Sequence, residues 1–203
     1  MEEKGTLERI LECGMEYFLK YTFKSAPLRK IVAEAGVTTG AFYGYFANKE
    51  ELFYALTDET AKGFTEILNS VAEDMNKFPP EEKLFRMCSA YIKRIPEIVD
   101  YLLENRDAMR LIIACSQGTK YEDFFGKLQK YNEDNISKSA VDANISKKNI
   151  HPLSENTMGL LMYGYFTILA KLIVEESSRE TIIRCMTETA KVYEIGILAL
   201  MEE

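Results

Sequence analysis

Residues 24–53 read KSAPLRKIVAEAGVTTGAFYGYFANKEELF, and this stretch decides the fold that we expect. Pro27 suits the first turn of a short helix, and Gly36 suits the left-handed position that ends one. Thr38 can cap the next short helix, Thr39 to Phe46, because its hydroxyl can accept from the first backbone amides. Two short helices joined by a tight turn that contains glycine predict a helix-turn-helix.

Helical periodicity continues on both sides of this stretch. Before it, apolar residues at positions 7, 10, 11, 15 and 18 form one stripe, which predicts an amphipathic helix. After it, Asn48 and Glu51 fit a capping box that begins a much longer helix, running to about Met75. No segment alternates convincingly with period two, so the sequence predicts an all-α protein.

The rest of the chain also divides into helices. We expect them at about 81–95, 97–104, 106–116, 119–138, 154–176 and 178–201, with a break at Pro96 and a polar loop at 142–152. The last two helices are apolar on more than one face. This indicates that they pack against a partner as well as against their own core.

The chain has 203 residues, 47% of them hydrophobic, which suffices for one domain or for a small domain joined to a larger one. Its 25 basic and 32 acidic residues give a net charge of −7, which excludes a protein that coats nucleic acid without sequence preference. The charge is uneven, because residues 20–49 contain five basic residues and one acidic residue, Glu34. This segment carries +4 and the remainder −11, so we expect only this segment to meet phosphate.

Other function classes find little support in the residue types. The four cysteines form no CxxC pair and the single histidine, His151, lies in the polar loop, which argues against a zinc site or another metal centre. No phosphate-binding loop or nucleophile motif is present, so we expect neither an enzyme nor a bound cofactor. The longest charge-free apolar stretch, 159–170, is shorter than the roughly 20 residues of a membrane helix. With no secretory signal, these features predict a cytoplasmic protein.

Residues 24–53 resemble the DNA-binding region of TetR-type bacterial transcriptional regulators. The residues that match at the family's spacing are Ile31, Ala35, Gly36, Val37, Gly40, Phe42, Tyr43, Tyr45, Phe46, Lys49, Glu50 and Leu52. Two positions depart from the family pattern, Pro27 and Val32, where the family commonly has a small hydroxyl residue and alanine. The resemblance implies a helix-turn-helix DNA-binding domain in residues 1–50 and a helical regulatory domain, for ligand binding and dimerisation, in residues 51–203.

The resemblance and the geometry of the motif together assign DNA-binding roles to particular side chains. The expected DNA-binding residues are Ser25, Arg29, Thr38, Thr39, Gly40, Ala41, Tyr43, Tyr45 and Lys49. Hydroxyls at the front of the second short helix can meet bases or phosphates, and small residues let the backbone come close. Tyr45 and Lys49 suit phosphate contact, whereas Phe42 faces the other way, with Phe46, and should be core. The alternative for Tyr43 and Tyr45 is that they merely pack.

The regulatory domain that the resemblance implies would enclose a small apolar effector. Aromatic and soft side chains that suit such a cavity are Met87, Cys88, Tyr91, Met109, Ile112, Tyr121, Phe124, Phe125, Met162, Tyr163 and Phe166. Residues of these types are more often ordinary core, and this alternative stays open.

The resemblance implies a ligand-responsive transcriptional regulator. We expect a homodimer through the last two helices, which places two recognition helices in successive major grooves of a palindromic double-stranded operator, about 34 to 36 Å apart. We expect a repressor that the effector releases by favouring another separation of these helices, with the long helix from Asn48 transmitting the change. The alternative is a helical adaptor that binds protein partners through its C-terminal helices and does not bind DNA.

Overall fold

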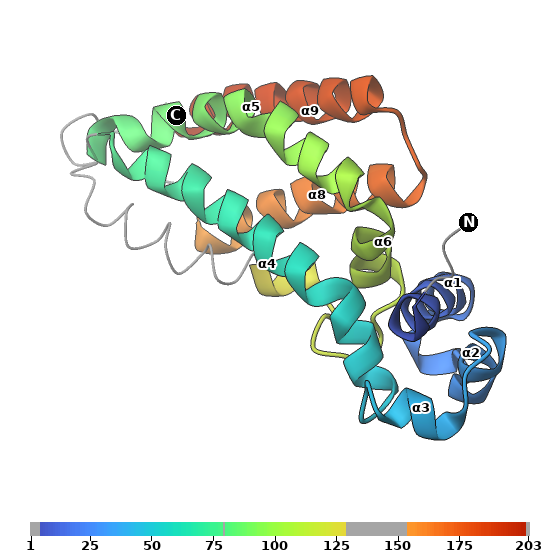
Figure 1. Cartoon of the computed structure of the whole chain (residues 1–203). Helices are drawn as coiled ribbons and strands as arrows, with labels where there is room; N and C mark the ends of the chain where they lie inside the picture. Colours follow the sequence, from blue (N-terminus) through green and yellow to red (C-terminus); the bar gives the residue numbers. More distant parts are fainter. Residues whose placement is uncertain (1–4, 79, 129–153, 202–203) are drawn as a thin grey trace. The chain divides into compact units, whose positions relative to one another are not determined.

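The computed structural model describes residues 5–78, 80–128 and 154–201, and for residues 75, 76, 80–88, 155, 158, 198 and 201 it describes the backbone alone. The helices in these ranges are α1 Thr6–Ser25, α2 Leu28–Glu34, α3 Thr39–Tyr43, α4 Lys49–Asn76, α5 Pro80–Glu104, α6 Arg106–Ala114, α8 Glu155–Val174 and α9 Arg179–Met201 (Figure 1). No strand occurs among the described residues, so the predicted all-α class is confirmed.

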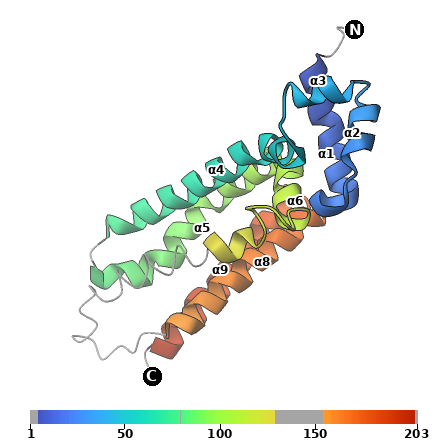
Figure 2. The same cartoon turned by 90° about the horizontal axis from the view of Figure 1, so that it is seen from below.

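Contacts between the helices divide the chain into two compact units. Unit 1 contains Met1–Gly63 and Asn105–Phe124, and unit 2 contains Phe64–Glu104 and Phe125–Glu203. The N-terminal part of α4 therefore belongs to unit 1 and its C-terminal part to unit 2. In unit 1, α1 packs against α2 and α6, and α2 packs against α3. In unit 2, α9 packs against both α5 and α8 (Figure 1, Figure 2).

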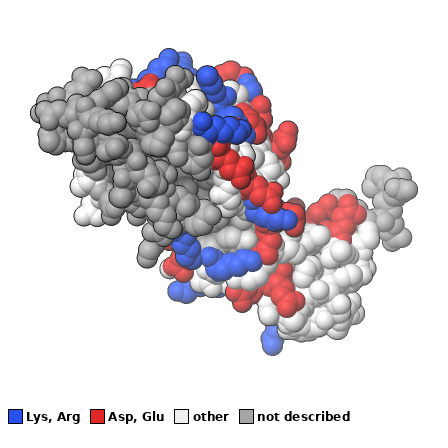
Figure 3. Space-filling model, turned by 90° about the vertical axis from the view of Figure 1, so that its left-hand side faces the viewer, with Lys and Arg blue, Asp and Glu red and all other residues white. Residues whose placement is uncertain are grey.

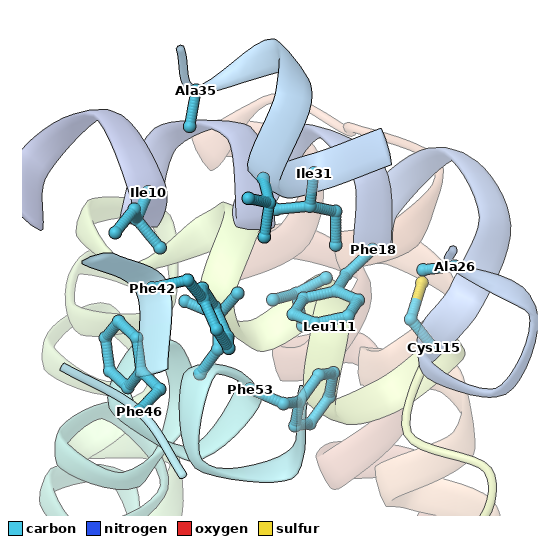
Figure 4. Close-up of a cluster of buried hydrophobic side chains, with 12 residues drawn as sticks. Ile10, Phe18, Ala26, Ile31, Ala35, Phe42, Phe46, Phe53, Leu111 and Cys115 are labelled. Carbon is cyan, nitrogen blue, oxygen red and sulfur yellow. The ribbon is translucent and has the colours of Figure 1, made fainter. Parts of the chain in front are cut away.

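Unit 1 is built around a cluster of buried apolar side chains that α1, α2, α3, α4 and α6 share (Figure 4). The cluster consists of Ile10, Phe18, Ala26, Ile31, Val32, Ala35, Phe42, Phe46, Leu52, Phe53, Leu111 and Cys115. Phe42 and Phe46 are 0% and 7% exposed, which confirms their predicted place in the core. A fully buried side chain of this size contributes roughly 1.5–3 kcal/mol relative to an exposed one, so this cluster holds the helix-turn-helix to the rest of unit 1.

The buried face of α1 differs slightly from the predicted stripe. Ile10 and Phe18 are fully buried, but Leu7 is 41% exposed. The third buried residue of this face is Gly14, which packs against Leu52 of α4. A Cβ built on Gly14 would lie 3.0 Å from Leu52 Cδ2, so the two helices approach each other at a position without a side chain. A stripe drawn from apolar side chains misses this contact because glycine has none.

The turn between α2 and α3 forms as the sequence predicts. Gly36 has a φ of +65°, the left-handed conformation that glycine adopts without steric penalty after a helix. The Thr38 hydroxyl accepts from the Ala41 amide at 3.1 Å and caps α3. α3 ends at Tyr43 and is therefore shorter than expected. Gly44, a poor helix former, ends it and begins a hydrogen-bonded turn.

The predicted capping box begins α4. Asn48 Oδ1 accepts from the Glu51 amide at 2.8 Å, and Glu51 Oε2 accepts from the Ala47 amide at 2.7 Å. These bonds satisfy amides that the start of a helix would otherwise leave without acceptors. The helix reaches Asn76, close to the end that the sequence predicts.

Pro96 does not break α5, contrary to the prediction of two helices that meet there. The helix runs without interruption through Pro96, whose side chain is exposed. Ile95 and Ile98, on either side of it, are each 2% exposed, and α5 packs along α9. A proline removes one backbone hydrogen bond, and the burial of its apolar neighbours outweighs that loss.

Part of the expected middle region lies outside the described residues. Residues 119–123 form a turn, and helical backbone occurs at 124–128, so the helix expected at 119–138 begins later than predicted. The rest of that helix and the loop with His151 fall on residues that the structure does not describe. Among the described helices, none combines the length and the apolar character that a membrane crossing requires.

The interior of unit 2 is rich in aromatic contacts. Phe125 stacks on Phe166 with 5.4 Å between ring centroids, and Phe64 meets Phe125 edge-on at 6.0 Å. The Tyr165 hydroxyl donates to the Met186 carbonyl at 3.2 Å and so joins α8 to α9. Offset and edge-on ring pairs of this kind each add roughly 0.5–1.5 kcal/mol to the burial of the rings.

Candidate nucleic-acid interface

Small and hydroxyl-bearing residues of α3 and its cap lie at the surface of unit 1. Thr38, Thr39 and Gly40 are exposed, and Ala41 is half-buried. Tyr43, at the end of the helix, is 54% exposed. The structure therefore brings five of the predicted DNA-binding residues together on one short element. Side chains of this size and chemistry can reach base edges or phosphates while the backbone approaches closely.

Both tyrosines of this motif are exposed, and the ring of one of them packs against a buried ring. Tyr43 and Tyr45 are 54% and 50% exposed. The ring of Tyr43 meets the buried ring of Phe42 edge-on, with 5.4 Å between centroids. About half of each tyrosine side chain is thus available to a partner, and a phenol can offer it both an apolar face and a hydroxyl.

Lys49 holds the start of α4 to the end of α1. Its Nζ donates to the Ala26 carbonyl at 3.1 Å and to the Lys24 carbonyl at 3.4 Å, and it lies 4.7 Å from the centroid of the Phe23 ring. Burial lowers the pKa of Lys49, which is half-buried. An ammonium group has three N–H donors, and two of those of Lys49 serve the fold.

The remaining predicted contacts lie at the start of α2. Ser25 and Arg29 are exposed, as are the basic residues Lys24 and Lys30. On the face drawn in Figure 3, basic and acidic side chains are interspersed over the described surface. The net charge of +4 is a property of residues 20–49 in the sequence.

Gly36 and Gly40 of the helix-turn-helix differ in whether the backbone requires glycine. Gly36 needs its left-handed backbone, with φ +65°. Gly40 lies inside α3, and a Cβ added there would meet only Thr38 Oγ1, at 3.9 Å. The fold has room for a side chain at position 40, although glycine weakens a helix by roughly 0.5–1 kcal/mol relative to alanine.

The residues expected to line an effector cavity are distributed over both units. Met109, Ile112, Tyr121 and Phe124 belong to unit 1, and Tyr91, Phe125, Met162, Tyr163 and Phe166 belong to unit 2, while the side chains of Met87 and Cys88 lie outside the described part. Met109, Ile112 and Phe166 are buried, and Tyr163 is 44% exposed. A single set of lining residues therefore does not emerge from the described contacts, and the effector site stays a prediction.

The buried hydroxyl of Tyr91 lacks a hydrogen-bond partner among the described residues, which the sequence did not predict. Its ring meets that of Tyr165 edge-on at 5.3 Å, and burial raises the pKa of the hydroxyl. Buried polar groups are normally hydrogen-bonded, so a ligand with a hydrogen-bond acceptor could satisfy this hydroxyl.

A polar cluster in unit 1 was not predictable from the sequence. The hydroxyl of Tyr121, one of the residues predicted to bind a ligand, donates to Asp58 Oδ1 at 2.7 Å. Lys120 pairs with the same carboxylate at 2.8 Å. Asp58 lies in α4, far from position 121 along the chain, and no motif relates the two. Only the packing of unit 1 brings them together.

The N-terminal region matches a known family. Residues 10–56, which cover most of α1, all of α2 and α3 and the beginning of α4, match the family described as bacterial regulatory proteins, tetR family. The HTH-type transcriptional regulator YerO of Bacillus subtilis strain 168 is 27% identical over 103 residues, which are 51% of this chain and 35% of YerO. The matched region thus spans about a third of that relative's length.

Solved structures share the fold over nearly the whole chain. A member of the TetR transcriptional regulator family from Streptomyces coelicolor superposes with a TM-score of 0.60 at 14% identity, covering 100% of this chain and 96% of that one. PfmR from Thermus thermophilus has a TM-score of 0.55 at 17% identity, covering 99% and 100%. FadR from Bacillus subtilis, solved with stearoyl-CoA, has a TM-score of 0.55 at 13% identity, covering 95% and 98%. At these identities the likeness establishes a common fold.

Proposed function

We propose that this chain, which belongs to the tetR family of bacterial regulatory proteins, acts as a homodimeric repressor that a small apolar effector releases from a palindromic operator. It is a transcriptional regulator by family, and such regulators are in general DNA-binding proteins rather than enzymes. The observation that carries the proposal is the surface of α3, where Thr39, Gly40 and Tyr43 are exposed.

DNA binding is supported by the agreement of several features in residues 1–50, the segment that we propose as the DNA-binding domain. Exposed hydroxyls, a bare Gly40 and the net charge of +4 within residues 20–49 all suit the approach of a polyanion. The remaining −11 would repel DNA from the rest of the chain, so that one orientation is favoured. Thr38 contributes indirectly, because its hydroxyl fixes the start of α3.

Dimerisation through α8 and α9 is supported by the apolar residues that these helices leave in water. Leu160 and Tyr163 of α8 are 71% and 44% exposed, and Val192, Ile195 and Leu200 of α9 are 66%, 70% and 52% exposed. Val192 and Ile195 are three residues apart and share a face of the helix. Large aliphatic side chains grouped in this way indicate a protein partner, and we propose a second copy of the chain.

Effector binding in the regulatory part, residues 51–203, is supported by the buried hydroxyl of Tyr91 beside the ring of Tyr165. An apolar molecule with one hydrogen-bond acceptor would satisfy that hydroxyl and lie among aromatic rings. FadR, a protein of the same fold, was solved with stearoyl-CoA, which makes a long-chain acyl thioester a suitable first probe. On this proposal α4 transmits the change, since it contributes to both units.

The test begins with selection of duplexes from a random library by the purified full-length protein. We expect an inverted repeat whose half-sites lie about one helical turn apart, and a complex that contains two copies of the chain. Stearoyl-CoA should then lower the affinity for the selected duplex in fluorescence anisotropy, and Tyr91→Phe should reduce that response without changing the affinity of the free protein.

The alternative is a helical adaptor without DNA binding, and the exposed face of α9 would serve it equally well. The selection distinguishes the two functions. An adaptor enriches no duplex above the library, whereas a regulator enriches one that Tyr43→Ala no longer retains. Failure of enrichment with a stable dimer would overturn the proposal of a repressor and favour the adaptor.

A further inference from the structure

The segment between α6 and the next helical turn, residues 115–121, contacts both helices that flank the helix-turn-helix; we call it the strap. The Cys115 carbonyl accepts from the Phe23 amide at 2.8 Å, near the end of α1. The Lys120 amide donates to the Tyr54 hydroxyl at 3.1 Å, in the first turns of α4. Every one of these residues belongs to unit 1.

Asp58 is the point at which the strap is most firmly attached to α4. Its carboxylate accepts from the Tyr121 hydroxyl at 2.7 Å and from Lys120 Nζ at 2.8 Å. Burial, and then the hydrogen bond to Asp58, raise the pKa of Tyr121, so its hydroxyl remains a donor at neutral pH. Lys120 Nζ also lies 4.1 Å from the centroid of the Tyr54 ring. The carboxylate thus receives two charge-assisted bonds from one segment.

The attachment continues to the first turn of α4. The Tyr54 hydroxyl donates to Glu50, one residue after Lys49. Lys49 in turn donates to the Ala26 carbonyl at 3.1 Å. A series of contacts therefore runs from the strap, along the start of α4, to the connection that leads into α2.

The backbone at the end of α1 is strained where the strap meets it. Thr22 has φ 63° and ψ 162°, a conformation that a β-branched residue rarely adopts. Its neighbour Phe23 donates to the Cys115 carbonyl, and the Thr22 carbonyl accepts from the Ala26 amide at 3.0 Å. Such conformations persist where surrounding contacts hold them, so the strap is one of the groups that fix this junction.

We infer that the strap is a positioning device that fixes the orientation in which unit 1 presents α2 and α3 to DNA, with Asp58 as its anchor. The inference rests on the proposed function for its DNA part. The chain enters the helix-turn-helix at the end of α1 and leaves it at the start of α4, and the strap contacts both of these junctions. Loosening the strap broadens the range of orientations and lowers the fraction of chains competent to bind.

The test compares Asp58→Ala with Asp100→Ala in the full-length protein. Asp100 of α5 is a matched control, because its carboxylate accepts from Arg179 at 2.5 and 2.9 Å, and both partners are about as exposed as Asp58 and Lys120. Asp58→Ala should weaken binding to the selected duplex roughly threefold to tenfold. The slope of log K against log salt should stay at the wild-type value, because the chains that do bind make the full set of phosphate contacts. Asp100→Ala should match the wild type in both.

Hydrogen exchange measured by mass spectrometry gives a readout that needs no DNA. In Asp58→Ala the amides of residues 22–45 should exchange at least about threefold faster than in the wild type, as expected for a higher open population. If acceleration is confined to residues 115–121 while operator affinity stays at the wild-type value, the strap stabilises only its own loop and the inference is overturned.

Two further variants keep the test decisive. If Asp58→Ala folds poorly, Tyr121→Phe, which removes only one hydroxyl, takes its place. It should lower operator affinity and accelerate exchange in the same regions, but by smaller factors. Lys120→Arg keeps the charge and donors and should bind and exchange like the wild type. If the wild type selects no duplex, the repressor proposal fails, and exchange in residues 22–45 still decides whether the strap holds the motif.

Discussion

Two surfaces of this chain leave apolar side chains in water, one at α3 in unit 1 and one on α9 in unit 2. Tyr43 and Tyr45 are 54% and 50% exposed, and Val192 and Ile195 are 66% and 70% exposed. Exposure alone therefore does not separate them. Their chemistry does, because the first surface carries hydroxyls and lies within residues 20–49, whose net charge is +4, whereas Val192 and Ile195 are purely aliphatic.

The difference indicates what each surface requires of a partner. Covering aliphatic carbon gains about 25 cal/mol per Å² only if the partner is also apolar, as a second copy of α9 would be. A phenol can lie on a sugar or base with its ring and donate to phosphate with its hydroxyl. Four experiments separate these roles, from the largest expected effect to the smallest.

Ile195→Glu should have the largest effect, because it introduces a charge into the surface that we propose as the dimer interface. We expect a monomer by size-exclusion chromatography with light scattering, and operator affinity lower by roughly 100-fold through the loss of bivalent binding. Lys93→Glu, on the exposed side of α5, introduces the same side chain and should leave the dimer intact. A dimeric Ile195→Glu protein would show that α9 is not the interface.

Tyr43→Ala should lower operator affinity about tenfold, which is 1.4 kcal/mol, because the ring and hydroxyl are both lost. Tyr43→Phe keeps the ring and should therefore lower operator affinity by less than Tyr43→Ala does. The melting temperature should stay near that of the wild type, since half of the side chain is in water. Tyr21→Ala, at another exposed tyrosine of unit 1, serves as the control. Equal losses at both positions would mean that Tyr43 has no specific contact.

Lys49→Met should affect both folding and DNA binding, unlike the substitution of a purely exposed lysine. The carbonyls of Ala26 and Lys24 lose their donor, which should lower the free energy of unfolding by about 1 kcal/mol in urea titrations. Operator affinity should fall severalfold. Lys30→Met, at an exposed position, should weaken binding without changing stability. If Lys49→Met leaves the stability unchanged, its hydrogen bonds contribute nothing to the fold.

Gly40→Ala and Gly196→Ala form a matched pair, because an added Cβ meets only Thr38 Oγ1 at 3.9 Å in the first and nothing within 4 Å in the second. Each should raise helix stability by roughly 0.5–1 kcal/mol. Gly40→Ala should lower operator affinity a fewfold and spare the dimer, whereas Gly196→Ala should weaken the dimer a fewfold and leave operator affinity unchanged at concentrations where the dimer stays intact. Anisotropy and analytical ultracentrifugation measure the two effects, and exchanged outcomes would invert our assignment of the surfaces.

Local features of unit 1 were predictable because neighbouring residues determine them. Gly36, the cap at Thr38 and the capping box at Asn48 each depend on residues within four positions, and all three form as predicted. The period of the apolar residues likewise predicts Phe42 and Phe46 in the core.

What the sequence did not predict depends on contacts between distant segments. The break expected at Pro96 is absent because packing of α5 on α9 outweighs one missing hydrogen bond. Asp58 and Tyr121 are 63 residues apart, and no spacing rule relates them. Tyr91 resembles any other core tyrosine until its hydroxyl is found buried without a partner among the described residues.

The contact of Gly14 with Leu52 has a genetic consequence. Even a methyl group at position 14 would begin 3.0 Å from Leu52 Cδ2, and Leu52 is fully buried. Overpacking of this kind destabilises a protein by roughly 1–3 kcal/mol, so Gly14→Ala should melt several degrees lower while its surface residues stay unchanged. If the protein is the repressor that we propose, this substitution should give a temperature-sensitive allele in cells, with target genes silent at low temperature and transcribed at high temperature. A reporter assay at two growth temperatures would measure it.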